Sequence, residues 1–214
     1  MPQNNPQKLY QKGSRNRSYF MSSPEQIQQL RSEMGVGIMD AKKALEESGD
    51  DFEKAREILR KKGAVIASKK STREAKEGAV VSYIHANGKI GVILKLYCET
   101  DFVARTKEFQ ELANNLAMHI AAMDPQYVSP NDIPADIIET EKRIYSEQFA
   151  DSGKPADILE DIIKGKIDKF ASEVSLLGQP FVKDQDKNIK EVIEEHIAKF
   201  GENIQIGDFT RYEL

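Results

Sequence analysis

The sequence changes character at Cys98-Glu99-Thr100-Asp101-Phe102-Val103-Ala104, and the fold can be worked out on either side of this stretch. Residues 90–97 before it are almost continuously apolar, as in a central strand that is buried on both faces. From Thr100 onward, apolar residues recur three and four positions apart, which predicts one long amphipathic helix lying across a sheet. Asp101 and Phe102 then fall at the N-terminal end of that helix, at the edge of its packed face.

Two interpretations of this helix start follow from the residues alone. In the structural one, Thr100 is the N-cap, Asp101 favours the positive end of the helix dipole and Phe102 covers the local core. In the functional one, Phe102 offers a large apolar ring to a partner. Cys98, at the end of the strand, is expected to be a buried structural thiol, because a nucleophilic cysteine needs a nearby base.

A hairpin precedes this stretch, and a third strand follows it far along the chain. Residues 80–85 alternate with period two, and Asn87-Gly88 is the strongest short signal for a hairpin turn. A last helix over residues 189–200 ends at Gly201, and residues 204–214 are predicted to form a terminal strand. One face of that strand is predicted to carry Ile204, Ile206, Tyr212 and Leu214. Residues 135–178 suggest an antiparallel helical pair that either closes over the sheet or projects as an arm.

Upstream of the hairpin the sequence has a helical period. Ser23-Pro24-Glu25-Gln26 has the form of a capping box with proline at N1, and Gly35 ends this first helix. A third helix is expected to end before Gly63. The second helix, between them, is predicted to turn the following residues inward: Ile38, Ala41 and Leu45.

These patterns predict an α+β protein, with a three-helix bundle followed by a core in which a small antiparallel sheet packs against helices. We expect a disordered basic leader (1–21), the three-helix domain (22–68) and a mixed-charge linker on which that domain hinges (69–78). The core domain (79–214) includes the helical pair 135–178 and is expected to carry dimerisation.

The charge balance bears on the kind of partner. The chain has 214 residues, with 31 Lys+Arg against 35 Asp+Glu and a net charge of -4. Residues 1–21 hold four basic residues and no acid, so the rest of the chain has 27 basic and 35 acidic residues, a net charge of -8. An acidic body favours a protein partner over direct contact with nucleic acid.

Several other features bound the function. The single cysteine excludes an internal disulfide and fits a reducing, cytoplasmic compartment, and no apolar run is long enough to span a membrane. The leader lacks the apolar region of a secretory signal, and we interpret it as an alternative start, an added tag or a transit segment. Because no Walker A, HExxH, nucleophile elbow or CxxC pattern occurs, we expect no enzyme activity, metal or cofactor.

Three motifs resemble translation elongation factor Ts. They are Thr100-Asp101-Phe102-Val103-Ala104 preceded by Cys98, MGVGIMDAKKAL at residues 34–45, and LLGQPFVKD at residues 176–184 followed by Gly201-Glu202-Asn203-Ile204. Their order and spacing over about residues 22–214 are far more specific than one short motif. The chain looks like the short type of this family, with a single core lobe, and its first domain resembles the ubiquitin-associated bundle.

The resemblance implies a guanine-nucleotide exchange factor for elongation factor Tu. In the family, an Asp-Phe pair inserts into the GTPase domain and disturbs the magnesium and phosphate side of the nucleotide site. Carried over to this chain, Asp101 and Phe102 are the wedge, supported by Thr100, Val103 and Ala104. The residues that match the contact surface of the N-terminal bundle are Leu30, Arg31, Ile38 and Met39. A homodimer formed through the sheet is also implied.

Two departures from the family and two other function classes complete the expectations. The family often carries a basic pair where this chain has Gly207-Asp208, and often an acid where it has Gly178, so no partner contact is assigned to the terminal strand. An adaptor for ubiquitin-like proteins could use the bundle alone, but it would not need the Asp101-Phe102 motif. An RNA-binding protein could use the basic leader, but the acidic body lacks aromatic platforms for bases.

Overall fold

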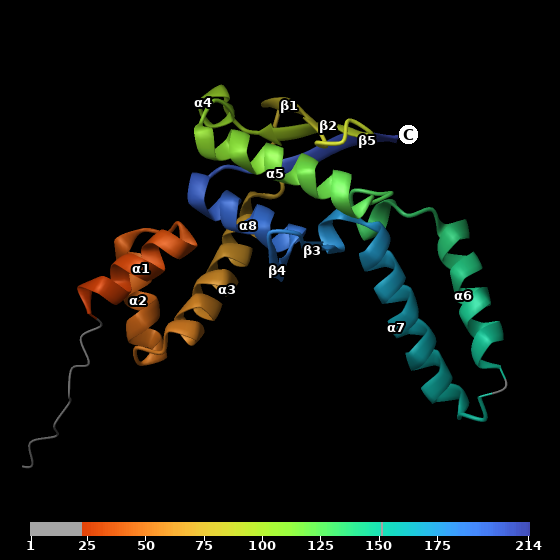
Figure 1. Cartoon of the computed structure of the whole chain (residues 1–214). Helices are drawn as coiled ribbons and strands as arrows, with labels where there is room; N and C mark the ends of the chain where they lie inside the picture. The colour runs from red at the N-terminus through yellow and green to blue at the C-terminus, as the bar shows by residue number, and fades with distance from the viewer. Residues whose placement is uncertain (1–22, 151) are drawn as a thin grey trace, which may run out of the picture.

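The computed structural model describes residues 23–150 and 152–214, and the expected leader lies outside the described residues. The fold is α+β, as predicted (Figure 1). The helices are α1 (Pro24–Met34), α2 (Ile38–Ser48), α3 (Phe52–Lys70), α4 (Asp101–Ala104), α5 (Lys107–Met123), α6 (Ala135–Phe149), α7 (Ala156–Val174) and α8 (Ile189–Phe200), with short 3-10 turns η1 (Pro130–Asp132) and η2 (Leu176–Gly178). The strands are β1 (Glu77–Ile84), β2 (Ile90–Cys98), β3 (Pro180–Phe181), β4 (Asp184–Asn188) and β5 (Gln205–Glu213).

The main sheet is antiparallel, with the strand order β1-β2-β5, so β2 is central as predicted. Its burial differs from the prediction, because only one face is covered. Val92, Leu94, Leu96 and Cys98 are buried, whereas Ile93 on the opposite face is 51% exposed. The helices α5 and α8 lie on one side of the sheet (Figure 1), and no described element covers the other side. The apolar run therefore marks one core face and one exposed apolar face.

A β-bulge in β5 changes which residues of the terminal strand face the core. Leu96 lies opposite Ile206 and Leu94 opposite Phe209, so β5 uses one residue more than β2 between these pairs. The extra residue reverses the alternation of side chains along the strand. The predicted single face is therefore wrong, since Phe209 packs against the core while Tyr212 and Leu214 are exposed.

The bundle has its own small core, built from residues of all three helices: Leu30, Met34, Ala41, Ala44, Leu45, Ala55 and Leu59. The predicted capping box at Ser23 and Gln26 is confirmed, as is the left-handed Gly35 that ends α1. Ile38, however, is exposed and not inward. It is the first residue of α2, and side chains of helices point back toward the N-terminus, beyond the turn that packs.

Helix α3 continues through Gly63 to Lys70, so its predicted end is wrong. Gly63 is buried, and a Cβ placed on it would lie 3.8 Å from Cβ of Ala198 in α8. This glycine therefore allows two helices to pack closely and does not end a helix. The second half of α3 reaches the main core through Ala67, and Lys70 Nζ donates to the carbonyl of Gly201 at 2.5 Å.

The helices α6 and α7 form an arm that projects away from the sheet (Figure 1), which decides between the two expected arrangements. Neither helix has a fully buried residue. The base of the arm is held by a buried polar cluster. His119 on α5 lies 3.0 Å from Gln179 Oε1 through Nε2, and its Nδ1 accepts the N–H of Val182 at 3.3 Å. Gln179 Nε2 donates to the carbonyl of Glu173 at 2.6 Å.

This cluster predicts a loss of stability on mild acidification. Burial lowers the pKa of His119 below its ordinary value of 6.5, against a smaller opposing effect of the Gln179 hydrogen bond. In the unfolded chain the imidazole takes up a proton as the pH falls through its ordinary pKa, but in the folded chain the buried imidazole stays neutral at that pH. The free energy of unfolding therefore keeps its full value above this pH and decreases below it.

Urea unfolding of wild type and His119→Gln at pH 7.5 and 5.5 measures this effect. The difference between the two pH values should be smaller in the variant. Part of it should persist, because burial also lowers the pKa of His196. An equal pH difference in both proteins would contradict the assignment of this effect to His119.

Candidate partner-binding site

The strand β2 leads directly into a single helical turn, α4, that carries an exposed phenyl ring. Thr100 is the N-cap, as predicted, and its side chain accepts the N–H of Val103 at 3.4 Å. Phe102 is 82% exposed, so it does not cover the core. The structural interpretation, in which this ring packs on the local core, is therefore wrong.

The other motif residues hold this turn from both sides. Asp101 lies 3.0 Å from Nη2 of Arg105, one turn further on. Val103 packs partly buried against the main core, and Ala104 is buried. Phe102 is therefore the residue of the motif that points into solvent while its neighbours face inward or pair at the surface.

The predicted long helix is in fact two helices. Thr106 is a second N-cap, whose hydroxyl accepts the N–H of Phe109 at 3.2 Å and donates to the carbonyl of Val103 at 2.8 Å. Gln110 Nε2 also donates to the carbonyl of Ala104 at 2.6 Å. The break between Ala104 and Lys107 separates α4 from the packed helix α5, so the ring can stand away from the core face.

A carboxylate network that sequence reasoning missed lies behind the turn. Glu202, between α8 and β5, accepts the backbone N–H groups of Glu99 and Thr100 at 3.1 and 3.0 Å. Its other oxygen accepts the hydroxyl of Thr100 at 2.7 Å. The only signal in the sequence was Gly201-Glu202-Asn203-Ile204, noted as part of a resemblance without a role for any residue.

Cys98 is buried beneath the turn, as predicted, and its Sγ donates to the carbonyl of Thr100 at 3.1 Å. Burial is the main cause that raises its pKa to about 11, with a further contribution from Glu202. The thiolate is the reactive form of cysteine. Cys98 is therefore a poor nucleophile at neutral pH.

This environment predicts slow modification of Cys98. A pKa two units above the ordinary value of 9.0 reduces the thiolate about 100-fold, and burial slows access further. We expect Ellman's reagent at pH 7.5 to label the folded protein at least about 100-fold more slowly than the urea-unfolded protein. Equal rates in the two states would contradict the buried position.

The bundle supplies a second exposed surface. Arg31, Ile38 and Met39 are exposed, and Met39 is 59% accessible. Leu30 is completely buried in the bundle core, so the expectation of direct partner contact is corrected for this residue. The small bundle needs Leu30 to fill its interior. Figure 1 places this bundle and α4 at the same end of the molecule, opposite the arm.

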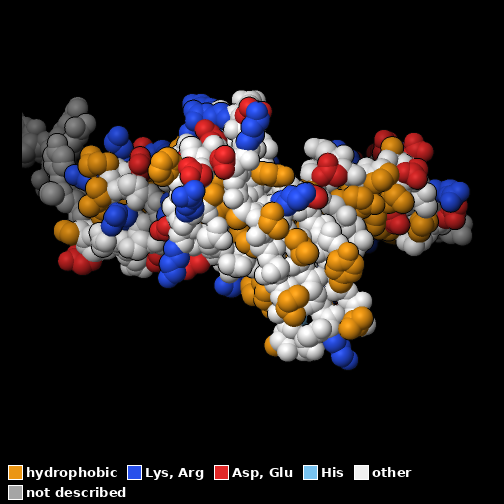
Figure 2. Space-filling view, turned by 90° about the horizontal axis from the view of Figure 1, so that it is seen from above, with side chains coloured by type: hydrophobic (Ala, Val, Ile, Leu, Met, Phe, Trp, Pro, Cys, Tyr) orange, Lys and Arg blue, Asp and Glu red, His pale blue; other side chains and the backbone are white. Residues whose placement is uncertain are grey.

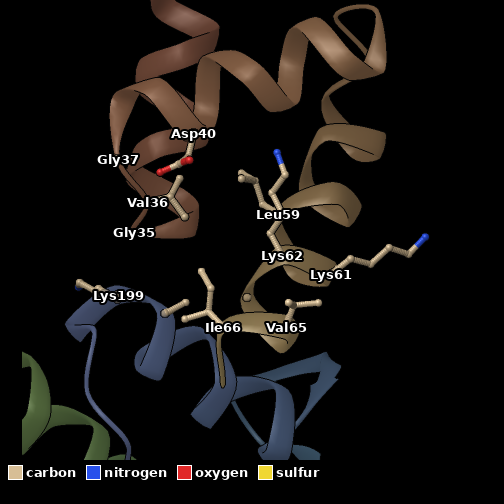
Figure 3. Close-up of a pocket in the computed structure, with 12 residues that line it drawn as sticks. Gly35, Val36, Gly37, Asp40, Leu59, Lys61, Lys62, Val65, Ile66 and Lys199 are labelled. Carbon is tan, nitrogen blue, oxygen red and sulfur yellow. The ribbon is translucent and has the colours of Figure 1, made fainter. Parts of the chain in front are cut away.

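A cleft of about 410 Å³ lies between the bundle and the core (Figure 3). The side chains of Val36, Leu59 and Ile66 point into it, while Lys61 points away. A Cβ on Gly35 would meet the Cδ atom of Lys199 at 3.1 Å, so this glycine lets the α8 side chain pass under the first loop. The bundle thus rests on α8 on one side of the cleft.

Within residues 23–150 and 152–214, no group of three His, Cys, Asp or Glu side chains could hold a metal ion. No helix of these same residues has the length and apolar character needed to cross a membrane.

Comparison with known proteins tests the family resemblance that these motifs suggested. The family model described as Elongation factor TS matches residues 18–214. The chain belongs to the elongation factor Ts family. It is 55% identical to elongation factor Ts of Fervidobacterium nodosum over 192 residues, which is 90% of this chain and 98% of the relative. Elongation factor Ts of Thermosipho melanesiensis is 52% identical, with 91% and 99% covered, and that of Thermotoga maritima is 54% identical, with 90% and 96% covered.

Membership of the elongation factor Ts family makes the chain a translation elongation factor, as its motifs suggested. The match covers the bundle, the α4 turn and the terminal strand together. The relatives are covered almost completely by this chain, so they are of similar length to it.

Proposed function

We propose that this chain is a guanine-nucleotide exchange factor for elongation factor Tu and acts without catalysing a chemical reaction. The observation that carries the proposal is the position of Phe102, which is almost fully exposed on a one-turn helix whose other residues are held in place. A turn whose backbone is already held by hydrogen bonds loses little backbone entropy when its aromatic side chain enters a partner.

In this proposal, Asp101 and Phe102 enter the GTPase domain near the magnesium and phosphate side of its nucleotide site. Thr100, Val103 and Ala104 support the wedge. Each tenfold weakening of GDP binding by the factor requires a tenfold weakening of factor binding by GDP, about 1.4 kcal/mol. Incoming nucleotide can therefore release the factor, and one molecule can act repeatedly.

The bundle provides the second contact in the proposal. Arg31, Ile38 and Met39 face the partner, while Leu30 supports them from the bundle core. We assign this contact to a domain of residues 22–68, joined by a linker (69–78) to the core domain (79–214), which includes the arm. The basic leader (1–21) is not required for exchange in this proposal.

The uncovered face of the main sheet suggests a homodimer. Its outward rows bring together Val80, Ile84, Ile93 and Tyr212, all more than half exposed. Figure 2 looks down on this side of the molecule and shows hydrophobic side chains gathered on it. A second copy related by a two-fold axis would cover the same patch on both chains. We propose that this pairing occurs in the cytoplasm and that the protein does not bind nucleic acid directly.

The experiment is release of fluorescent GDP from elongation factor Tu. A sub-stoichiometric amount of this protein should accelerate release of all bound nucleotide, and the protein lacking residues 1–21 should act equally well. An unchanged release rate at micromolar protein would refute exchange activity. Binding to a ubiquitin-like protein in that case would favour the adaptor function of the bundle.

A further inference from the structure

Glu202 lies far from the wedge in sequence but contacts the backbone on which the wedge is built. Helix α8 ends at Gly201 with a φ of 72°, and the chain then turns so that Glu202 faces the loop between β2 and α4. Its two oxygens accept three hydrogen bonds, from the N–H groups of Glu99 and Thr100 and from the Thr100 hydroxyl. A carboxylate that accepts several such bonds fixes its donors more firmly than a neutral acceptor does.

The hydrogen bonds to Thr100 determine how α4 begins. Thr100 has φ of -130° and ψ of 153°, the extended conformation of an N-cap, and its Oγ1 accepts the N–H of Val103. The same hydroxyl donates to Glu202, so the cap oxygen is oriented by the carboxylate. Phe102 is only two residues further on, and any change in the backbone at Thr100 moves its ring.

A second carboxylate, that of Glu99 in the loop before α4, accepts a hydrogen bond from the turn after α8. Glu99 Oε1 accepts the N–H of Asn203 at 2.6 Å, and its other oxygen lies 3.6 Å from Nη1 of Arg73. Buried Asn203 donates through Nδ2 to the carbonyl of Arg73 at 2.7 Å. These contacts join three segments: the connection after α3, the loop before α4 and the turn after α8.

We propose that Glu202 is a positioning residue for nucleotide exchange, which holds Thr100 so that Phe102 and Asp101 are presented at a fixed angle. This inference rests on the proposed function. Glu202 is partly buried at the back of the loop and acts through Thr100, not by touching the partner. Because the same network holds the connection after α3, it also fixes the wedge relative to the bundle.

A double-mutant cycle with the full chain tests the proposal. Glu202→Ala should slow stimulated GDP release about tenfold, an effect within the range of coupling energies measured for neighbouring residues. In a Phe102→Ala background the same substitution should have a much smaller effect, limited to what the presentation of Asp101 still contributes. Glu202→Gln keeps an acceptor oxygen and should restore part of the activity. Glu194→Ala is the control and should remain active, because it removes another partly buried glutamate that lies within α8 and lines a pocket against α3.

Additive effects of Glu202→Ala and Phe102→Ala would overturn the proposal, as would equal activity of Glu202→Ala and the control. Should Glu202→Ala fail to fold, the cycle is run with Glu202→Gln, which should also be non-additive with Phe102→Ala. If Glu202→Gln slows GDP release and this effect adds fully to that of Phe102→Ala, the proposal is contradicted.

Amide hydrogen exchange separates this inference from the proposed function. In Glu202→Ala the N–H groups of Glu99 and Thr100 should exchange with solvent at least about tenfold faster, since they lose their acceptor, while amides paired between β1 and β2 keep their protection. Unchanged protection of both amides would refute the role of Glu202. If wild type does not stimulate GDP release, the exchange function fails while this measurement still decides whether Glu202 holds the loop.

Discussion

Phe102→Ala is expected to remove most of the exchange activity while leaving the fold intact. The ring is 82% exposed, so its loss should change the free energy of unfolding by less than about 1 kcal/mol, as at other surface sites. A core phenylalanine would instead cost about 3–5 kcal/mol. Aromatic residues at the centre of an interface contribute about 2–4 kcal/mol to binding, so stimulated GDP release should fall roughly 30-fold or more.

The measurement combines urea midpoints with stimulated GDP release. Phe149→Ala, the same substitution at the end of the arm helix α6, is the control and should leave exchange unchanged. Asp101→Ala should also weaken exchange, because it removes the Arg105 pair and the acid at the start of α4. A Phe102→Ala protein that unfolds early, or one that is stable and fully active, would each contradict the wedge assignment.

Ile93→Asp is expected to convert the protein from a dimer to a monomer. Ile93 lies on the central strand, between Ser82 of β1 and Thr210 of β5, in the middle of the uncovered face. Burying an unpaired carboxylate there costs several kcal/mol, enough to abolish association of an interface of ordinary affinity. The isolated chain should keep its fold, because this side chain faces solvent within one copy.

Light scattering should give about twice the chain mass of 24.1 kDa for wild type and the single-chain mass for Ile93→Asp. Ile158→Asp is the matched control, because it places the same charge on an exposed isoleucine of α7. The control should remain a dimer, and reducing agent should not change either result because Cys98 is buried. A wild-type monomer at high concentration, or a dimeric Ile93→Asp, would contradict a dimer formed through this face.

Much of the fold could be predicted because its signals are local. The capping box at Ser23, the left-handed turn at Gly35, the Asn87-Gly88 hairpin and the helix end at Gly201 each depend on residues a few positions apart. The predicted end of the third helix at Gly63 was wrong because this glycine packs against Ala198, which is distant in the sequence. The bulge at Gly207-Asp208 was missed for a similar reason. A Cβ on Gly207 would meet the Tyr97 ring at 2.6 Å, and Asp208 pairs with Lys95 at 2.9 Å.

The sequence by itself determined the α+β class, the central place of β2, the cap at Thr100 and the family motif that contains Asp101 and Phe102. Only the tertiary structure decided that Phe102 is exposed, that one sheet face is uncovered, and that Glu202 holds the loop before α4. Periodicity and capping are set by neighbours within one or two turns of chain, so they are visible in the sequence. Exposure and the meeting of Glu202 with Thr100, 102 residues apart, depend on how whole elements pack, which no local pattern specifies.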